Sequence, residues 1–489
     1  MKVLVIYDDT VLKSELINDI VGNKGFSDVI VKRRRIESYY KENVSRIYPE
    51  MSWITVRSAF EFNGLAEKIE LDYANDYRII HCFSNFIFSD FGEAELSFKK
   101  LEFIKHTYKV CCGKYTAALF FANTDDYKVY LKRVCRLSNS VSAAKEIKDS
   151  FRINGLTNIA KVENFIQCIS GNFDSRYFNS LGGDEYTLVK SSTNKTKIKS
   201  EYTYYHLLPD EMKMWFVMPF NYTEDSEKAS YTMERLHITD LAIKWVHGSI
   251  DKDEFSDIMD KYFYFLSSRH KKSVSAGQYQ KTADALYIDK VKSRISTLKK
   301  KDAFQKIQQV LSSCNSLDID DLVNRYLELK KRVEKTVRFR HEAVIGHGDP
   351  CFANTMYNKA TKTLKFIDPK GALSEEELWT DPYYDVAKLS HSVCGRYDFF
   401  NNALFEIKIY EDFTSRLTID FDNSEYVEIF KEKLTENGYD YLAVRLYEAS
   451  LFLSMLPLHI DYPHKVYGFI LNAVDILNEI ENELDKKHK

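Results

Sequence analysis

VIGHGDPCFANTMYNKATKTLKFIDPKG, residues 344–371, is the stretch that decides the fold of this chain. It predicts a strand, a polar turn and a second strand. Asp349 stands in a His-Gly-Asp turn, and Asn354 follows it by five residues. Asp368 comes directly after the apolar strand 364–367. The His-Gly-Asp turn alone is equally typical of an ordinary polar turn, and Asp368 alone of a helix cap. The information therefore lies in the combination and order of the two.

The Asp-x-x-x-x-Asn spacing is the arrangement that phosphoryl transfer uses. In such loops the Asp takes the proton of an attacking hydroxyl, and the Asn helps to hold a magnesium ion. A second Asp after an apolar strand supplies the main carboxylate to the metal, which neutralises charge on the nucleotide phosphates. The pattern therefore predicts Asp349 as the catalytic base, with Asn354 and Asp368 as ligands of Mg²⁺.

On these residues the chain resembles the aminoglycoside phosphotransferase / choline kinase family, small-molecule kinases related to the protein kinases. The resemblance covers the C-terminal two-thirds of the chain and implies ATP as co-substrate, Mg²⁺ and a bilobal α+β fold. Asp368-Pro369-Lys370 replaces D-F-G, and no A-P-E segment follows, so the expected acceptor is a hydroxyl of a small molecule. A sugar, an amino alcohol and a surface-glycan precursor all remain open as that acceptor, as does the identity of the nucleoside triphosphate.

A strand at 187–190 followed by a helix predicts the nucleotide side of the site. In the kinase-like fold a strand lysine contacts the phosphates and a helix glutamate orients it by an ion pair. Lys190 and Glu201 occupy these places in order, with the neighbouring lysines 195, 197 and 199 as alternatives. Gly182-Gly183 is the candidate for the phosphate-covering turn. By resemblance the run 230–236 is the hinge, where Glu234 and Leu236 would meet the adenine.

Two further residues are expected to support the catalytic turn. His347 is predicted to fix the turn through hydrogen bonds, because the adjacent Asp already fills the role of base. The segment 379–389 resembles the family's D-P-x-x-D-hydrophobic-A pattern, whose second Asp braces the catalytic loop from behind. By that resemblance Asp385 is a structural support.

The length and composition set the frame for these motifs. A chain of 489 residues exceeds the usual size of a single core, so more than one domain is expected. We predict an α/β Rossmann-like domain with a mainly parallel sheet at 1–168 and a kinase-like phosphotransferase domain at 169–489. The latter would have a small lobe at 169–238 and a larger helical lobe at 239–489, with strands including 214–219 and a loop insertion at 268–300.

The bulk properties exclude several classes of protein. A net charge of −3 gives no nucleic-acid footprint. The eight cysteines form no C-x-x-C pair, which argues against a zinc site or a disulfide framework. No signal peptide and no membrane span is predicted, so a cytoplasmic location with access to ATP is expected. The oligomeric state stays open.

The N-terminal half opens with an apolar strand that ends at Asp8 and Asp9. Open α/β sheets bind ligands at the carboxyl edge of such strands, although helix capping explains the same residues. Neither a G-x-G-x-x-G nor a P-loop is present. Two alternatives to a plain kinase are kept: a catalytically inactive kinase-like binding protein, and a bifunctional protein with a nucleotidyltransferase-like N-terminal half. The latter needs a carboxylate-lined metal site near Asp8 and Asp9.

Overall fold

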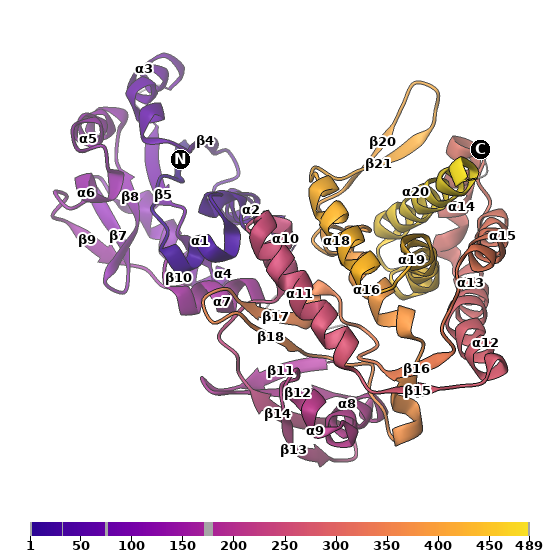
Figure 1. The fold of residues 1–489 in the computed structure, drawn as a ribbon. Helices are drawn as coiled ribbons and strands as arrows, with labels where there is room; N and C mark the ends of the chain where they lie inside the picture. The colour runs from indigo at the N-terminus through magenta and orange to yellow at the C-terminus, as the bar shows by residue number, and fades with distance from the viewer. Residues whose placement is uncertain (1, 32, 74–76, 171–178, 488–489) are drawn as a thin grey trace. The chain divides into compact units, whose positions relative to one another are not determined.

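The computed structural model describes residues 2–31, 33–73, 77–170 and 179–487 (Figure 1). It divides into two compact units. Unit 1 comprises Met1–Phe173 with His247–Ser249, and unit 2 comprises Asp174–Val246 with Ile250–Lys489. The predicted boundary between 168 and 169 falls inside helix α7 (Val162–Ser170) of unit 1.

Unit 1 is built on a six-stranded sheet in the order β4-β1-β5-β8-β7-β9. Every residue of β1 (Val3–Asp8) is buried, and because successive side chains point to opposite faces, both faces of the sheet are covered there. Strand β1 pairs in parallel with β4 and β5, and β7 pairs in parallel with β9, whereas β8 runs antiparallel to β5 and β7. The sheet is therefore mixed and mainly parallel, as the sequence predicts.

The remaining elements of unit 1 connect and cover this sheet. Its other strands are β2 (Ile30–Val31), β3 (Arg34–Arg35), β4 (Ser52–Val56), β5 (Arg78–Phe83), β6 (Phe86–Phe88), β7 (Tyr108–Cys112), β8 (Tyr115–Phe121), β9 (Ser150–Arg152) and β10 (Leu156–Asn158). Its other helices are α1 (Glu15–Val21), α2 (Ile36–Ile47), α3 (Phe62–Asp72), α4 (Phe91–Lys99), α5 (Thr124–Leu137) and α6 (Ser140–Ala144).

Unit 2 begins with a four-stranded antiparallel sheet in the order β11-β12-β14-β13, on which α8 (Lys195–Leu207) packs. The strands are β11 (Asn179–Gly183), β12 (Thr187–Ser192), β13 (Pro219–Glu224) and β14 (Ala229–Glu234). The predicted strand at 214–219 is wrong, because the chain makes a turn after α9 (Asp210–Lys213) and the strand begins at Pro219. Trp215 and Phe216 are buried from that turn.

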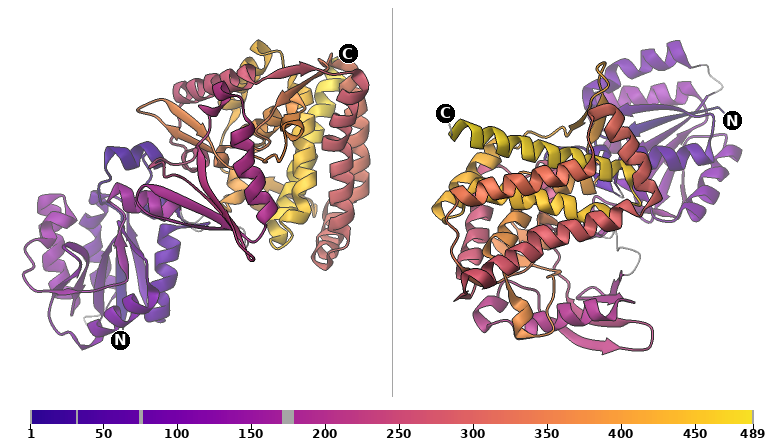
Figure 2. Two further views of the ribbon diagram at one scale, coloured as in Figure 1. Left: turned by 90° about the horizontal axis from the view of Figure 1, so that it is seen from below. Right: turned by 90° about the vertical axis from the view of Figure 1, so that its right-hand side faces the viewer.

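The rest of unit 2 is mainly helical. Helix α19 (Tyr441–Met455) is buried from Leu442 to Met455, which marks it as a central helix that is covered all round. Figure 2 shows α15, α19 and α20 running alongside one another. The helices are α10 (Leu241–His247), α11 (Lys252–Ser268), α12 (Ala276–Asp284), α13 (Lys290–Lys299), α14 (Asp302–Asn315), α15 (Ile319–Thr336), α16 (Pro382–Val393), α17 (Tyr397–Asn401), α18 (Ser424–Glu436) and α20 (Pro463–Lys487). The strands are β15 (Lys271–Ser273), β16 (Glu342–Ile345), β17 (Thr355–Asn358), β18 (Thr363–Phe366), β19 (Trp379–Thr380), β20 (Glu406–Ile409) and β21 (Ser415–Thr418).

The predicted loop insertion at 268–300 is wrong, because most of this segment is helical. Helices α12 and α13 join through a π-helical turn, Ala285–Asp289. Tyr279, Ala283, Tyr287 and Val291 are buried at a regular spacing of four residues. That spacing is longer than the 3.6 residues of an α-helix, and the wider π turn accommodates it.

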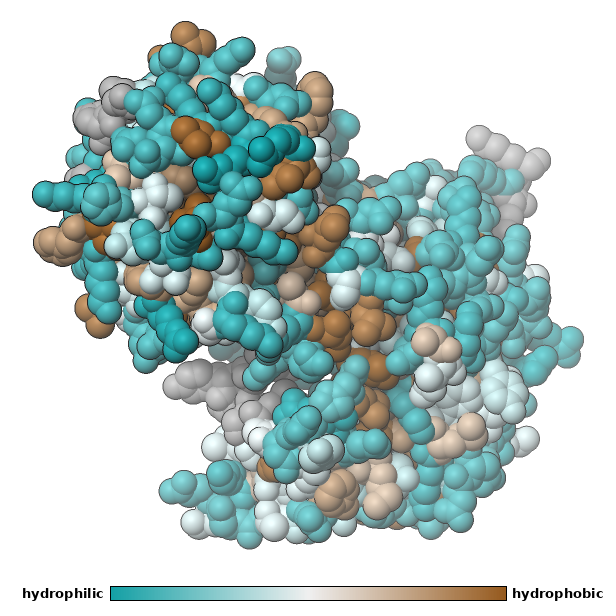
Figure 3. All heavy atoms as spheres, turned by 90° about the vertical axis from the view of Figure 1, so that its left-hand side faces the viewer, coloured by the Kyte–Doolittle hydropathy of each residue, from teal (hydrophilic) through white to brown (hydrophobic). Residues whose placement is uncertain are grey.

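Figure 3 and the helices of the described residues bear on the predicted absence of a membrane span. Hydrophilic side chains cover most of the face in Figure 3. Among the helices of the described ranges, none combines the length and the apolar composition needed to cross a bilayer.

Candidate functional site

Three of the predicted site residues meet in a buried ion cluster in unit 2. Lys190 Nζ lies 2.7 Å from Glu201 Oε2 and 2.7 Å from Asp368 Oδ1. The side chains of Lys190 and Glu201 are 4% and 1% exposed, whereas that of Asp368 is 40% exposed. The cluster therefore has a closed end at Glu201 and an open end at Asp368.

Local structure explains how these side chains reach one another. The side chain of Asn194 caps α8, and the buried face of that helix carries Ile198, Glu201 and Tyr204 at three-residue spacing. Tyr231 of β14 donates a hydrogen bond from its hydroxyl to Glu201 Oε2 at 3.1 Å. The helix glutamate is thus fixed from both sides, and it is a second anchor for the strand lysine.

Electrostatics keeps this cluster charged. Burial acts to lower the pKa of Lys190, but the carboxylates of Asp368 and Glu201 outweigh it and raise that pKa. Burial likewise acts to raise the pKa of Asp368, yet the Lys190 ammonium holds it below its ordinary value. Asp368 also adopts a left-handed backbone conformation with φ 55°, a sparsely populated state that recurs at functional sites.

The His-Gly-Asp turn lies beside this cluster. Asn354 Nδ2 donates to the backbone oxygen of Asp349 at 2.9 Å. The amide of Ile367 donates to the backbone oxygen of Asn354 at 3.0 Å, which ties the residue before Asp368 to the same loop. Gly348 allows the turn itself, because its φ of 82° disfavours any side chain. These hydrogen bonds join the backbone of Asp349, the side chain of Asn354 and the residue before Asp368 in one loop.

His347 holds the turn with both ring nitrogens. Nδ1 accepts from the amide of Asp349 at 3.0 Å, so the proton is on Nε2, which donates to the oxygen of Ile367 at 3.0 Å. The ring stacks on Phe216, with centroids 5.7 Å apart. Burial lowers the pKa of His347, which keeps the imidazole neutral. With both nitrogens engaged, His347 is not placed to act as a base.

Asp385 lies behind the turn. It accepts from the amides of His347 at 2.9 Å and Gly348 at 2.8 Å. Arg269 Nη1 lies 2.9 Å from Asp385 Oδ2, and both side chains are fully buried. The sequence analysis missed Arg269, which no local motif marks.

Lys388 is a second residue that the sequence analysis missed. Its Nζ lies 3.0 Å from Asp349 Oδ1, with the two side chains 19% and 39% exposed. It follows Asp385 by three residues on α16, so both side chains face the His-Gly-Asp turn. That helical spacing was a usable signal.

Glu234 and Leu236, the residues predicted to form the hinge, lie apart from the ion cluster. Glu234 ends β14 opposite Thr187, whereas Lys190 stands opposite Tyr231, which separates them by about 10 Å of strand. Leu236 follows in the loop after β14 and is partly buried. Gly182 and Gly183 belong to β11, and the turn after them is held by Arg235 Nε, which donates to the oxygen of Asp184 at 2.7 Å. Gly182 and Gly183 thus stand at the end of the strand directly before the β11–β12 turn, and the phosphate-covering role of that turn stays a prediction; residues 171–178 before them lie outside the described residues.

The donor set near Asp368 fits magnesium. Within the described ranges no group of three or more His, Cys, Asp or Glu side chains is placed to hold a metal ion. Mg²⁺ does not need one, because it is commonly bound by one or two carboxylates together with water and substrate phosphates. The carboxylate of Asp368 and the amide oxygen of Asn354 are hard oxygen donors of that kind.

The carboxylates of unit 1 are arranged differently. Asp8 is fully buried and accepts from Thr10 and Ser140, with His81 Nε2 at 3.0 Å. Asp9 points to Ser27 instead, whose amide donates to it at 3.0 Å. The two carboxylates therefore serve separate hydrogen-bond networks, and the described part of unit 1 holds no carboxylate-lined metal site.

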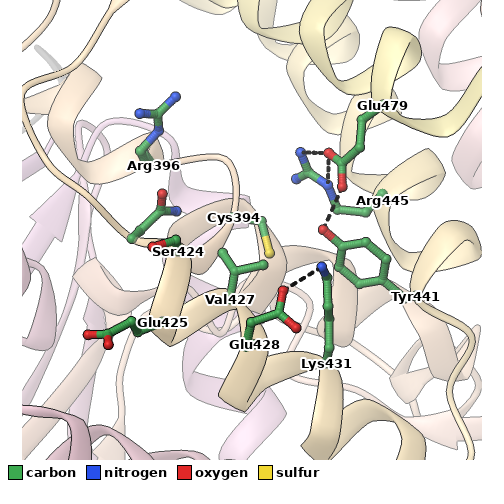
Figure 4. Close-up of a pocket in the computed structure, with 11 residues that line it drawn as sticks. Cys394, Arg396, Ser424, Glu425, Val427, Glu428, Lys431, Tyr441, Arg445 and Glu479 are labelled. Atoms are coloured by element: carbon green, nitrogen blue, oxygen red, sulfur yellow. Dashed lines mark hydrogen bonds and ion pairs between the residues drawn. The ribbon is translucent and has the colours of Figure 1, made fainter. Parts of the chain in front are cut away.

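A cavity of about 440 Å³ lies elsewhere in unit 2, among the ends of α16 and α18–α20 (Figure 4). Four of its charged side chains form two pairs: Arg445 with Glu479 at 2.8 Å, and Lys431 with Glu428 at 2.8 Å. None of the predicted site residues lines it.

Comparison with known proteins gives a distant likeness of fold. No protein-family model matches the chain, and no curated protein matches it. Among solved structures it is similar to aminoglycoside phosphotransferase APH(4)-Ia, with 12% identity, 65% of this chain and 97% of that chain covered, and a TM-score of 0.36. The apo form of a thermostable mutant of that enzyme gives 13% identity, coverage of 65% and 98%, and a TM-score of 0.34. Another structure of a thermostable mutant, a ternary complex with ADP and hygromycin B, gives 11% identity, coverage of 65% and 98%, and a TM-score of 0.34.

Proposed function

We propose that this protein is an ATP- and Mg²⁺-dependent phosphotransferase that moves a phosphoryl group to a hydroxyl of a small molecule. The observation that carries the proposal is the ion cluster, in which a strand lysine bridges a helix glutamate and the Asp after β18 at 2.7 Å each. Glu201 is closed off from solvent and Asp368 is open to it, so an incoming phosphate reaches Lys190 from the side of Asp368.

In the proposed reaction each residue has a separate task. Lys190 steadies the nucleotide phosphates, and Glu201 keeps it in place while Asp368 turns to the metal. Asp368 and Asn354 would hold Mg²⁺, which when bound neutralises phosphate charge. Asp349 receives the proton of the acceptor hydroxyl while the acceptor oxygen forms its bond to the γ-phosphorus. The bond from that phosphorus to the β–γ bridging oxygen breaks, and its electron pair leaves with the diphosphate.

The surrounding residues keep Asp349 in position. Asp385 accepts from the backbone amides of His347 and Gly348. The ring of His347 accepts from the amide of Asp349 and donates to the backbone oxygen of Ile367. These four hydrogen bonds hold the turn. Catalysis of phosphoryl transfer depends mainly on positioning and electrostatic stabilisation, which makes such support valuable. The adenine is proposed to meet the chain near Glu234 and Leu236.

Thermal unfolding with ATP, Mg²⁺ and both together tests the proposal. A hundredfold excess of ligand over its Kd adds about 2.7 kcal/mol to the free energy of unfolding, so ATP with Mg²⁺ should raise the melting temperature. Asp368→Asn should abolish the part of the shift that needs the metal, and Asp302→Asn, an exposed carboxylate at the start of α14, should keep it. A chain that ATP with Mg²⁺ does not stabilise would contradict the proposal.

A further inference from the structure

A row of side chains that the proposed reaction does not use leads away from Asp349. It starts at Lys388, whose Nζ lies 3.0 Å from the Asp349 carboxylate. Tyr384 stands one turn earlier on α16, so its side chain shares a helix face with Lys388. Lys290 of α13 donates from Nζ to the Tyr384 hydroxyl at 2.7 Å, and lies 5.1 Å from the centroid of its ring. We call Lys388, Tyr384 and Lys290 the lysine row.

Two ammonium groups, those of Lys388 and Lys290, act on Tyr384. Burial acts to raise the pKa of Tyr384, but these ammonium groups outweigh it, and the pKa lies below its ordinary value. A lowered pKa of a buried phenol reports nearby cations. Both lysines remain partly accessible, whereas Tyr384 is buried beneath them.

The charge balance of the row changes during the proposed reaction. Asp349 is the carboxylate in direct contact with Lys388. Once Asp349 takes the proton of the acceptor, it no longer balances that ammonium. A cationic group of the acceptor over the row would then meet two like charges, whereas an anionic group would replace the lost counter-charge.

We propose that the acceptor is an alcohol that also carries a phosphate or carboxylate, and that Lys388 and Lys290 bind this anionic group while Asp349 serves the hydroxyl. The inference rests on the proposed function and names its acceptor class. Among the acceptors left open by the sequence, it favours acidic or phosphorylated sugars and glycan precursors, and it disfavours amino alcohols.

The test uses the purified full chain, ATP, Mg²⁺ and sugars matched in shape but not in charge: glucose, glucosamine, glucuronic acid and glucose 6-phosphate. The anionic sugars should raise ATP consumption above the rate without acceptor, and glucosamine should not. Lys290→Gln should lower the anionic-to-neutral ratio of kcat/KM roughly tenfold through KM, the usual loss for a hydrogen bond to a charged group. Lys290→Arg should restore most of the ratio.

Controls separate a site effect from a folding effect. Lys292→Gln makes the same charge change at an exposed position of α13 and should leave the ratio unchanged. Equal melting temperatures of the two Gln variants would show that both fold alike. A preference for glucosamine, or no response to either anionic sugar while ATP with Mg²⁺ still stabilises the chain, would overturn the acceptor class alone. If ATP with Mg²⁺ neither stabilises the chain nor is hydrolysed by it, the proposed function is contradicted, and the proposed acceptor class with it.

Discussion

Asp8 in unit 1 and Asp368 in unit 2 follow the same sequence pattern, an acidic residue directly after an apolar strand. Asp8 is fully buried and accepts from two hydroxyl side chains besides its contact with His81. Asp368 has an accessible side chain, and it pairs with Lys190, which also pairs with Glu201. The pattern therefore marks a polar strand end, and the partners decide whether the carboxylate supports the fold or is available to a ligand.

The substitution Asp368→Asn tests the contrast between Asp8 and Asp368 most strongly. Removing the charge that would hold the metal should lower ATP turnover about 10³-fold or more, since one preorganised charge contributes about 4 kcal/mol to the barrier. Steady-state turnover measures the effect, and the melting temperature should change little. Asp8→Asn is the matched variant, and it should retain most of the turnover. Equal losses in both would abolish the distinction.

Unit 2 also holds a carboxylate that supports the fold, that of Asp385. The substitution Asp385→Ala should give the largest loss of stability. It leaves Arg269 charged, buried and unpaired, and takes the acceptor from two backbone amides. Breaking a buried pair in this way costs about 3–5 kcal/mol, which denaturant unfolding can measure. Arg269→Met is the counterpart, and it should cost less because Asp385 keeps both amide donors. The reverse order would contradict the role given to Asp385.

Asp8→Ala should weaken unit 1 by about 2–4 kcal/mol, because Thr10, Ser140 and His81 lose their shared acceptor. Hydrogen exchange over β1 and β5 should report the loss. The response of unit 2 to ATP with Mg²⁺ should stay the same. A simultaneous loss of that response would mean that the two networks are coupled.

The smallest expected effect is on pH dependence. Burial lowers the pKa of His347, so below its ordinary value of 6.5 the unfolded chain binds a proton that the folded turn does not. Stability of the turn should therefore fall as the pH drops below about 6.5, by at most ~1.4 kcal/mol per pH unit. For Asp8, burial acts to raise the pKa, but the bond to His81 and its other donors hold it below 3.8, so its contribution is lost only under more acid conditions. Exchange rates corrected for intrinsic pH effects should separate the two windows, and His347→Gln should remove the first.

The sequence predicted the elements whose patterns are local. The strand with Lys190, the helix with Glu201 and the Asp349–Asn354 spacing are each contained within a few turns of chain. Charge pairs between distant segments could not be predicted from the sequence. Arg269 meets Asp385 across 116 positions, and a single sequence does not say which of many charges pair.

The wrong predictions have physical reasons of the same kind. Composition suggested a loop at 268–300, whereas buried residues four apart form a helix with a π turn. The segment 214–219 was predicted as a strand, but Trp215 and Phe216 are buried from a turn. In both cases the burial of side chains by tertiary contacts decided the local structure, as it commonly does against weak propensities.

The π turn at Ala285–Asp289 stands immediately before Lys290. A turn of this type holds one residue more than an α-helical turn, so it keeps Lys290 on the helix face that the four-residue spacing of the buried side chains requires. Inserting one further residue there would rotate α13 by about 100° and carry Lys290 away from its neighbour on α16, while the helix itself survived. The proposed charge selectivity would then be lost through one small insertion, without any substitution among the residues proposed to bind the nucleotide.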